Sequence, residues 1–255
     1  MVVGVELTNN IGSEVYHSLN KSKKKKLVKR LLLGDSVAKQ LYDNDVYNDS
    51  IYSLTCNQVI SAAGYYFLLN NFITTNKEQL PEEVILLCNP RSLGNQLDAK
   101  AFNYFLKPLY KKEYTGLMNK PLKERIKQIP FYWASQIPLI KASCFTPTYE
   151  SLPRDYGLFS PIAQTYLDSI AELCKTNDIR FRLEPVPMKK SSYKEMLDLK
   201  QHIKYMPQMD AAILTHFFDQ YTFLEDSLFL DHSHFYKEHI PQDYLKLINF
   251  TQSEL

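Results

Sequence analysis

Short apolar runs that alternate with helix-like patterns are the feature that most limits how this chain can fold. The apolar runs cover residues 27–33, 51–56, 84–88 and 179–183. Helices are expected at 59–73, which is largely apolar, and at 161–175, where apolar residues fall at spacings of three and four. Strands that are apolar at nearly every position are buried on both faces, and strands that alternate with helices form parallel sheets. The sequence therefore predicts an α/β fold, a three-layer sandwich around a central, mostly parallel sheet.

Residues from about 100 to 153 break this rhythm. They are rich in Tyr, Phe, Lys and Pro and contain the single tryptophan, Trp133. We interpret them as a largely helical, aromatic-rich insertion, whose aromatic side chains either pack against the main sheet or line a substrate cleft. The chain then ends with a short apolar run at 227–230, expected to be the last strand, and a helix at 241–249. Because no repeat or low-complexity linker divides these parts, residues 27–255 are expected to form one domain.

The first 26 residues show weak periodicity and end in a block rich in lysine, Lys21–Lys26. Like charges so close together repel one another, so the simplest interpretation of residues 1–26 is a basic, solvated leading segment. The alternative is a patch that contacts an anionic membrane surface or a polyanionic glycan. The whole chain has 30 Lys and Arg against 28 Asp and Glu, a formal net charge of +2. This near-neutral balance argues against a nucleic-acid partner.

The cysteines are widely separated and form no CxxC pair; they are Cys56, Cys88, Cys144 and Cys174. We expect buried thiols, and the even number leaves a disulfide open. No run approaches the roughly 18 to 20 apolar residues that span a membrane, and the first residues lack the order of a secretory signal. The chain is expected to be soluble as given. It would be cytoplasmic or, if an upstream anchor has been removed, associated with the cell envelope.

Two polar motifs follow apolar runs at opposite ends of the chain. Gly34-Asp35-Ser36 follows the first run, at the strand edge where open parallel sheets bind ligands. Alone, this motif also fits an ordinary turn or helix cap. Asp231 and His234 follow the last run, at a spacing that lets the carboxylate bind one imidazole nitrogen while the other faces a serine. Since serine needs such a base to become a nucleophile, the two motifs together predict a Ser36–His234–Asp231 catalytic triad.

The order of these motifs resembles that of the SGNH, or GDSL, hydrolase superfamily. In that family a Gly-Asp-Ser block follows the first strand and an Asp-x-x-His block lies near the C-terminus, as Ser36 and the pair Asp231 and His234 do here. The resemblance covers the chain from about Leu27. It implies a flavodoxin-like, three-layer fold and a serine esterase mechanism that needs no cofactor and no metal.

The resemblance also implies two blocks that supply oxyanion donors, a glycine after the second strand and an asparagine after the third. Asn89 closes the run 84–88 and matches the asparagine. The glycine is missing, and Asn57 and Gln58 stand in its place. A backbone N–H of Asn57 or Gln58 can still serve, because the donor is the main chain.

A looser similarity concerns the run Asn89–Leu93 together with the aromatic insertion. It points to SGNH-like proteins associated with bacterial surface polysaccharide acetylation. This implies an esterase or O-acyltransferase that acts on an O-acyl ester of a glycan, with acetyl as the expected group, through an acyl-Ser36 intermediate. Members of that group often carry an anchor before the first strand, which would place Lys21–Lys26 beside a bilayer. The alternative is a non-catalytic glycan-binding module that keeps the fold.

A metal site is another interpretation of the C-terminal motif. His232, His234 and His239 together with Asp231 are residue types that bind zinc. A catalytic zinc site would also need a water-activating carboxylate and a second layer of supporting hydrogen bonds. It would leave the Gly-Asp-Ser motif unexplained.

Overall fold

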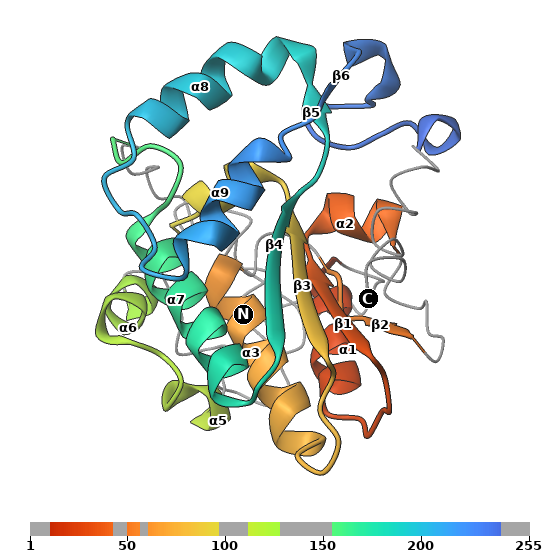
Figure 1. The fold of residues 1–255 in the computed structure, drawn as a ribbon, viewed down its shortest axis with the longest axis vertical. Coiled ribbons are helices and arrows are strands. Elements are labelled where there is room, and N and C mark those ends of the chain that lie inside the picture. The colour runs from red at the N-terminus through yellow and green to blue at the C-terminus, as the bar shows by residue number, and fades with distance from the viewer. Residues whose placement is uncertain (1–10, 43–49, 57–60, 97–111, 128–154, 241–255) are drawn as a thin grey trace, which may run out of the picture.

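The computed structural model describes five stretches of the chain: residues 11–42, 50–56, 61–96, 112–127 and 155–240. They form a central sheet with helices on both sides (Figure 1). Within these residues the main sheet has the order β2-β1-β3-β4, from β1 (Arg30–Gly34), β2 (Ile51–Ser53), β3 (Glu83–Cys88) and β4 (Arg180–Pro185). Every pairing in it is parallel. The predicted α/β class with a mostly parallel sheet is therefore confirmed.

Among the described residues, the helices that cover one face of the sheet include α1 (Ile11–Ser22), α3 (Ser61–Thr75) and α7 (Pro161–Thr176). Successive residues of a strand point to opposite faces, so Leu31 and Leu33 of β1 both point to this layer. Both leucines are fully buried. This face therefore carries the larger of the two hydrophobic cores.

The opposite face carries a smaller core. Leu32, between the two leucines of the larger core, points to this side and packs in one cluster with residues of α2 (Ser36–Leu41). Two aromatic residues from the other end of the chain, Phe229 and Phe235, belong to the same cluster and are almost fully buried. The helix after the first strand and the C-terminal segment therefore share one core.

The leading segment contains a helix that belongs to the larger core. Val15 and Leu19 of α1 are buried there together with residues of α3. Lys21 is buried as well, and its Nζ lies 4.9 Å from the centre of the Tyr52 ring. Where the structure describes it, the segment expected at 1–26 is thus not a detached, solvated tail. The reason is that α1 has an apolar side, which the weak overall periodicity of the segment concealed.

Other lysines of the block have acidic neighbours. Lys23 Nζ lies 3.1 Å from Glu113 Oε1, and Lys25 Nζ lies 3.7 Å from Glu78 Oε2. These ion pairs are exposed, so they contribute little to stability. They reduce the positive charge that Lys21–Lys26 presents, and contact of this block with a membrane or a glycan stays a prediction.

Beyond β4 the chain builds a group of small elements, most of which lie at the top of Figure 1, with α9 lower and beside β4. They are β5 (Met188–Lys189), η5 (Lys190–Ser192), α8 (Tyr193–Gln201), α9 (Ala211–Asp219) and β6 (Phe223–Leu224). β5 pairs with β6 in parallel, and α9 packs against β4. The edge of the main sheet at β4 is therefore covered in part by a helix.

The strand predicted at 227–230 is wrong. The segment begins as a 3-10 helix, η6 (Asp226–Leu228), and then makes a single antiparallel bridge between Phe229 and Phe235. The chain folds back on itself here, because the Leu230 N–H donates to the carbonyl of His234 at 2.7 Å. The segment therefore forms a short loop that lies beside α2 and outside the described sheets.

The predicted insertion is described only in part. Its described residues include two short helices, α5 (Lys112–Thr115) and α6 (Lys120–Lys127). Tyr114 stacks on Phe67 of α3, with ring centres 5.4 Å apart, so this part packs against the main domain. The remainder of 100–153, including Trp133, and the helix predicted at 241–249 lie outside the described residues.

Two further expectations concern thiols and membranes. Cys56, Cys88 and Cys174 are buried free thiols, whereas Cys144 lies outside the described residues. In the part of the chain that is described, no helix is both long enough and apolar enough to cross a membrane.

Candidate active site

The turn between β1 and α2 brings Ser36 to the C-terminal edge of the sheet. Gly34 ends β1 directly beside Leu87 of β3. A Cβ at this position would lie 2.4 Å from the Leu87 carbonyl oxygen and 2.4 Å from the Ala38 Cβ. Only glycine therefore allows so close an approach. Ser36 is the first residue of α2, with its side chain next to the helix N-terminus.

Asp35 ties this turn to the neighbouring strand. Its Oδ1 caps α2 by accepting hydrogen bonds from the N–H groups of Val37 at 3.0 Å and Ala38 at 3.2 Å. Its Oδ2 accepts from the N–H of Asn89, just after β3, at 2.6 Å. Burial raises the pKa of the Asp35 carboxyl, while the three N–H groups and nearby His234 act to lower it. The carboxyl thus joins the first and third strand ends, and its side chain points away from solvent.

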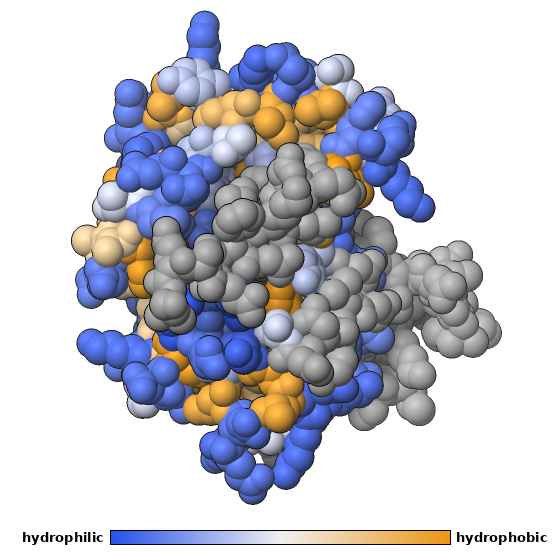
Figure 2. All heavy atoms as spheres, turned by 45° about the vertical axis from the view of Figure 1, so that its right-hand side comes forward, coloured by the Kyte–Doolittle hydropathy of each residue, from blue (hydrophilic) through white to orange (hydrophobic). Residues whose placement is uncertain are grey.

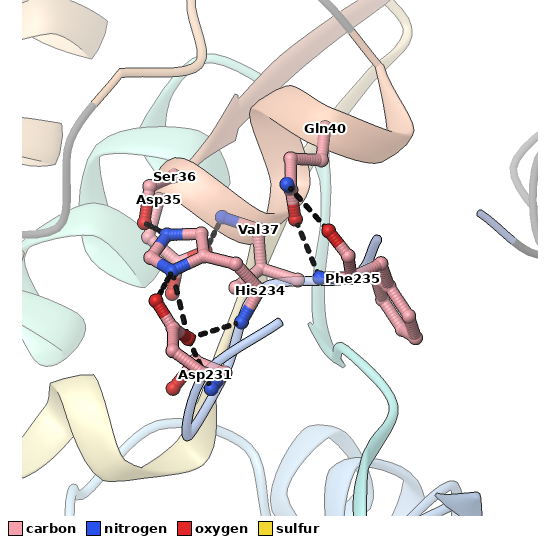
Figure 3. Close-up of polar contacts among 8 residues, drawn as sticks. Asp35, Ser36, Val37, Gln40, Asp231, His234 and Phe235 are labelled. Atoms are coloured by element: carbon pink, nitrogen blue, oxygen red, sulfur yellow. Dashed lines mark hydrogen bonds and ion pairs between the residues drawn. The ribbon is translucent and has the colours of Figure 1, made fainter. Parts of the chain in front are cut away.

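Three side chains from opposite ends of the chain form a continuous hydrogen-bonded row at this edge (Figure 3). His234 Nε2 lies 2.8 Å from Ser36 Oγ. His234 Nδ1 lies 2.8 Å from Asp231 Oδ2 and 3.0 Å from Asp231 Oδ1. The structure therefore brings together all three residues that the two sequence motifs singled out, and in the order serine, imidazole, carboxylate.

The partners of the imidazole decide which of its nitrogens carries the proton. A carboxylate can only accept, so the neutral ring places its proton on Nδ1, toward Asp231. Nε2 is then free to accept the hydrogen of the Ser36 hydroxyl. This is the arrangement in which a serine hydroxyl can lose its proton to a base as it attacks an electrophile.

Asp231 remains ionised at neutral pH. It is partly buried, which acts to raise its pKa, but the N–H groups of His234 and Ser233 and the His234 ring outweigh this and lower the pKa to about 2. Both N–H groups donate to Asp231 Oδ1 at 2.8 Å. The carboxylate therefore orders its own loop and also holds the imidazole.

Asn89 lies next to the turn that carries Ser36, because its N–H donates to Asp35. Its side chain is almost fully buried, and Oδ1 accepts from the Arg91 N–H at 3.0 Å. An N–H needs an oxygen as acceptor, so this bond also orients the amide and leaves Nδ2 available as a donor. Among the described residues no partner of Nδ2 is found. The other predicted donors, Asn57 and Gln58, lie outside the described residues.

The C-terminal histidines do not gather into a group that could hold a metal ion. Within the described residues, which include all of 231–239, no group of three His, Cys, Asp or Glu side chains could hold a metal ion. Both ring nitrogens of His234 face Ser36 and Asp231, and His232 and His239 are exposed. The histidines diverge because the segment is a loop and not a strand with alternate residues on one side.

Sequence reasoning missed Gln40, which contacts the loop that carries the histidine. Its side-chain amide makes two hydrogen bonds with the backbone of Phe235 (Figure 3). The one signal in the sequence is that Gln40 follows Ser36 by four residues, so both lie on the same side of α2. A polar residue at such a position is too common to be recognised as part of a site.

Hydrophobic residues gather at the top of the molecule on the face shown in Figure 2, the end at which α8 and β6 lie in Figure 1. Two large apolar side chains of α8, Tyr193 and Leu197, are exposed to solvent. Leu230, which precedes Asp231, is 62% exposed. An apolar side chain open to solvent therefore adjoins the carboxylate of the row.

Comparison of the chain with protein-family models, with curated proteins and with solved structures found no match.

Proposed function

We propose that this chain is a serine-dependent esterase or O-acyltransferase of the SGNH type, with Ser36 as nucleophile. The observation that carries the proposal is the row Asp231–His234–Ser36, with 2.8 Å at each of its two contacts. The position of Ser36 at the C-terminal edge of a parallel sheet and at the start of α2 supports it further, since both features favour binding of a polarised or anionic group.

In the first half of the proposed reaction, His234 Nε2 takes the proton of Ser36 as Oγ attacks the ester carbonyl. Asp231 holds the ring and stabilises its charged form. The negative oxygen of the tetrahedral intermediate accepts hydrogen bonds from Asn89 Nδ2 and from main-chain N–H groups of the kind expected at Ser36 and near Asn57. The C–O bond to the alcohol then breaks, and the alcohol leaves with the proton from His234. The product is an acyl ester on Ser36.

In the second half an acceptor hydroxyl removes the acyl group. His234 takes the proton of the acceptor as its oxygen attacks the acyl-Ser36 carbonyl, and then returns a proton to Ser36 Oγ as that bond breaks. With water as acceptor the product is a free carboxylic acid, and with a sugar hydroxyl it is a new sugar ester. We propose an O-acetyl ester of a glycan as the substrate, on the basis of the looser sequence similarity described above.

The first experiment is hydrolysis of p-nitrophenyl acetate by the purified chain near neutral pH, with Ser36→Ala as the matched control. The expected result is turnover by the wild type that falls by at least about 10³-fold in the control. Reaction with a fluorophosphonate should add one adduct, located at Ser36 by mass spectrometry. Equal rates for wild type and control, with no adduct, would reject the proposal and favour the non-catalytic glycan-binding module.

A second experiment separates hydrolysis from transfer. The acetyl donor is supplied together with an oligosaccharide acceptor, and free acetate and acetylated sugar are measured in the same sample. Acetylated sugar that disappears in Ser36→Ala would reject a purely hydrolytic role. Acetate alone, at every acceptor concentration up to its solubility, would reject the transferase with that acceptor.

A further inference from the structure

Gln40 holds the two parts of the candidate active site together through one residue. The Phe235 N–H donates to Gln40 Oε1 at 3.0 Å, and Gln40 Nε2 donates to the Phe235 carbonyl at 3.3 Å. Both backbone groups of Phe235 are therefore bound by one side-chain amide, in the way that a neighbouring strand would bind them. Figure 3 shows the two bonds beside the row of three side chains.

The bonds close a ring that contains the contact between serine and histidine. Gln40 lies one helical turn after Ser36 on α2, and Phe235 is the next residue after His234. The ring runs from Ser36 along α2 to Gln40, across to Phe235, back to His234 and again to Ser36. Because α2 is a rigid helical turn, the position of Gln40 determines how far His234 Nε2 lies from Ser36 Oγ.

Among the described residues, few other directional contacts fix the position of the loop that carries His234. It belongs to neither described sheet, and its backbone makes a single β-bridge, within the loop itself. The contact of Asp231 with His234 also lies inside the loop, so it cannot place the loop against the serine. Among the described residues, the other anchors are the packing of Phe229 and Phe235 in the smaller core, which is apolar and not directional, and two contacts at the start of the segment. There Asp226 Oδ1 accepts from the Ser191 N–H at 3.0 Å, and Lys189 Nζ lies 5.8 Å from the centre of the Phe229 ring.

We propose that Gln40 is a positioning residue that sets His234 against Ser36 by binding the backbone of Phe235. The inference rests on the proposed function and adds a residue to it. Among the described residues, the side chain of Gln40 makes no hydrogen bond to the side chain of His234 or Ser36, so it acts through the loop. Loss of the amide leaves the Asp231–His234 pair intact but lets it move as a unit relative to Ser36.

The test compares Gln40→Met with Gln164→Met. Methionine keeps the length of the side chain and its helix preference but removes both hydrogen bonds. Gln164 lies in α7, on the other face of the sheet, and its Nε2 donates to the Met206 carbonyl at 3.1 Å, so the control also removes a glutamine-to-backbone bond.

The kcat for p-nitrophenyl acetate should fall about 10- to 100-fold in Gln40→Met, while KM stays within about threefold of the wild-type value. Misplacement of a reacting group by about 1 Å has an effect of this size. Gln164→Met should retain the kcat of the wild type.

Gln40→Glu supplies a second variant that keeps size and shape. The carboxylate can still accept from the Phe235 N–H, but its second oxygen faces the Phe235 carbonyl and cannot donate at neutral pH. Its kcat should fall as in Gln40→Met. A kcat within twofold of wild type in both variants would overturn the proposal.

Hydrogen exchange of the Phe235 amide gives a measurement that does not depend on turnover. The amide should exchange faster in Gln40→Met than in the wild type, while amides of β1 and β3 exchange at unchanged rates. An unchanged rate at Phe235 overturns the role of Gln40 whether or not the chain is an enzyme. The wild type could instead show no turnover and no Ser36 adduct while Phe235 still exchanges faster in Gln40→Met. That result would reject the proposed function but keep the link between α2 and the loop.

Discussion

Ser36 follows a strand that is hydrogen-bonded to neighbours on both sides, whereas His234 belongs to a loop with a single β-bridge. On the serine side Asp35 is 1% exposed and binds three backbone N–H groups, one of them on the adjoining strand end. On the histidine side Asp231 has a side chain that is 52% exposed. The two sides of one candidate site are thus held in place in different ways.

The difference shows how much of a site's geometry comes from the backbone. On the serine side the sheet and the capped helix determine position, so few side chains other than Asp35 are needed. On the histidine side, position depends on side chains: the Gln40 amide and the rings of Phe229 and Phe235, whose centres lie 4.4 Å apart. Loss of a hydrogen-bonding side chain on the serine side should therefore affect stability first, whereas loss of one around the loop should affect alignment first.

The largest expected effect is a loss of activity, and it should be equally large for substitutions on the serine side and on the histidine side. Ser36→Ala and His234→Ala should each lower kcat by at least about 10³-fold, because neither group works without the other. The measurement is the rate of ester hydrolysis. His232→Ala is the matched control, since His232 is exposed and lies two residues from His234. Full activity in His234→Ala together with loss in His232→Ala would show that the base has been assigned wrongly.

Asp231→Asn tests the histidine side alone. The amide cannot accept the Nδ1 proton as the carboxylate does and favours the wrong tautomer of the ring, so kcat should fall by about 10² to 10⁴-fold. Thermal unfolding should show that the protein remains folded, because Asp231 is half exposed. A loss of less than fivefold would mean that the loop, and not the charge, orients the imidazole.

Phe235→Ala removes the apolar anchor of the loop. Phe235 is 1% exposed and stacks on Phe229, so the free energy of unfolding should fall by about 3 kcal/mol. Urea unfolding measures this loss, and the rate of ester hydrolysis of the still-folded variant measures alignment. Phe235→Leu, which keeps most of the buried volume, should lose less than half as much. If both variants kept full activity, packing in the smaller core would have no part in placing His234.

Asp35→Asn tests the serine side. The amide oxygen can still cap α2, but its NH₂ group then faces the N–H of Asn89, which loses its acceptor. Leaving one buried N–H without a partner should lower the free energy of unfolding by about 2 kcal/mol. Urea unfolding measures the change. A loss below about 0.5 kcal/mol would show that the link between the first and third strand ends contributes little.

The smallest expected effect is on stability in acid. The pKa of Asp231 is lowered to about 2 in the folded chain, against about 3.9 in unfolded chains. The unfolded state therefore binds the proton first as pH falls, so the stabilisation is complete above about pH 4 and is lost toward pH 2. Comparison of urea unfolding at pH 5 and pH 3 should show a smaller loss for Asp231→Asn than for the wild type. An equal loss of unfolding free energy in the two proteins would mean that the Asp231 carboxylate does not contribute to the pH dependence of stability.

Several parts of the fold and of the site could be predicted because their signals are local. Leu31 to Leu33, uninterrupted by polar residues, indicated a strand buried on both faces, and Gly34 marked the tight turn after it. Asp231 and His234 are three residues apart, and their contact forms within a single loop. Such features depend on spacing along the chain, which the sequence states directly.

Other features escaped prediction because they depend on contacts between distant residues. The run at 227–230 is apolar, as a strand would be, yet it bridges back to Phe235 and packs on α2. Lys21 lies in a block of like charges, yet it is buried against Tyr52 because α1 uses its apolar side to cover the sheet. In each case tertiary packing outweighed the local pattern.

By itself, the sequence determined the α/β class and named Ser36, His234 and Asp231, because strand patterns and short motifs are written in consecutive residues. Only the tertiary structure decided that these three side chains meet at 2.8 Å, and that Gln40 links helix and loop. The physical reason is distance along the chain: Ser36 and His234 are 198 residues apart. Contacts across such a separation form only when sheet, helix and loop pack together.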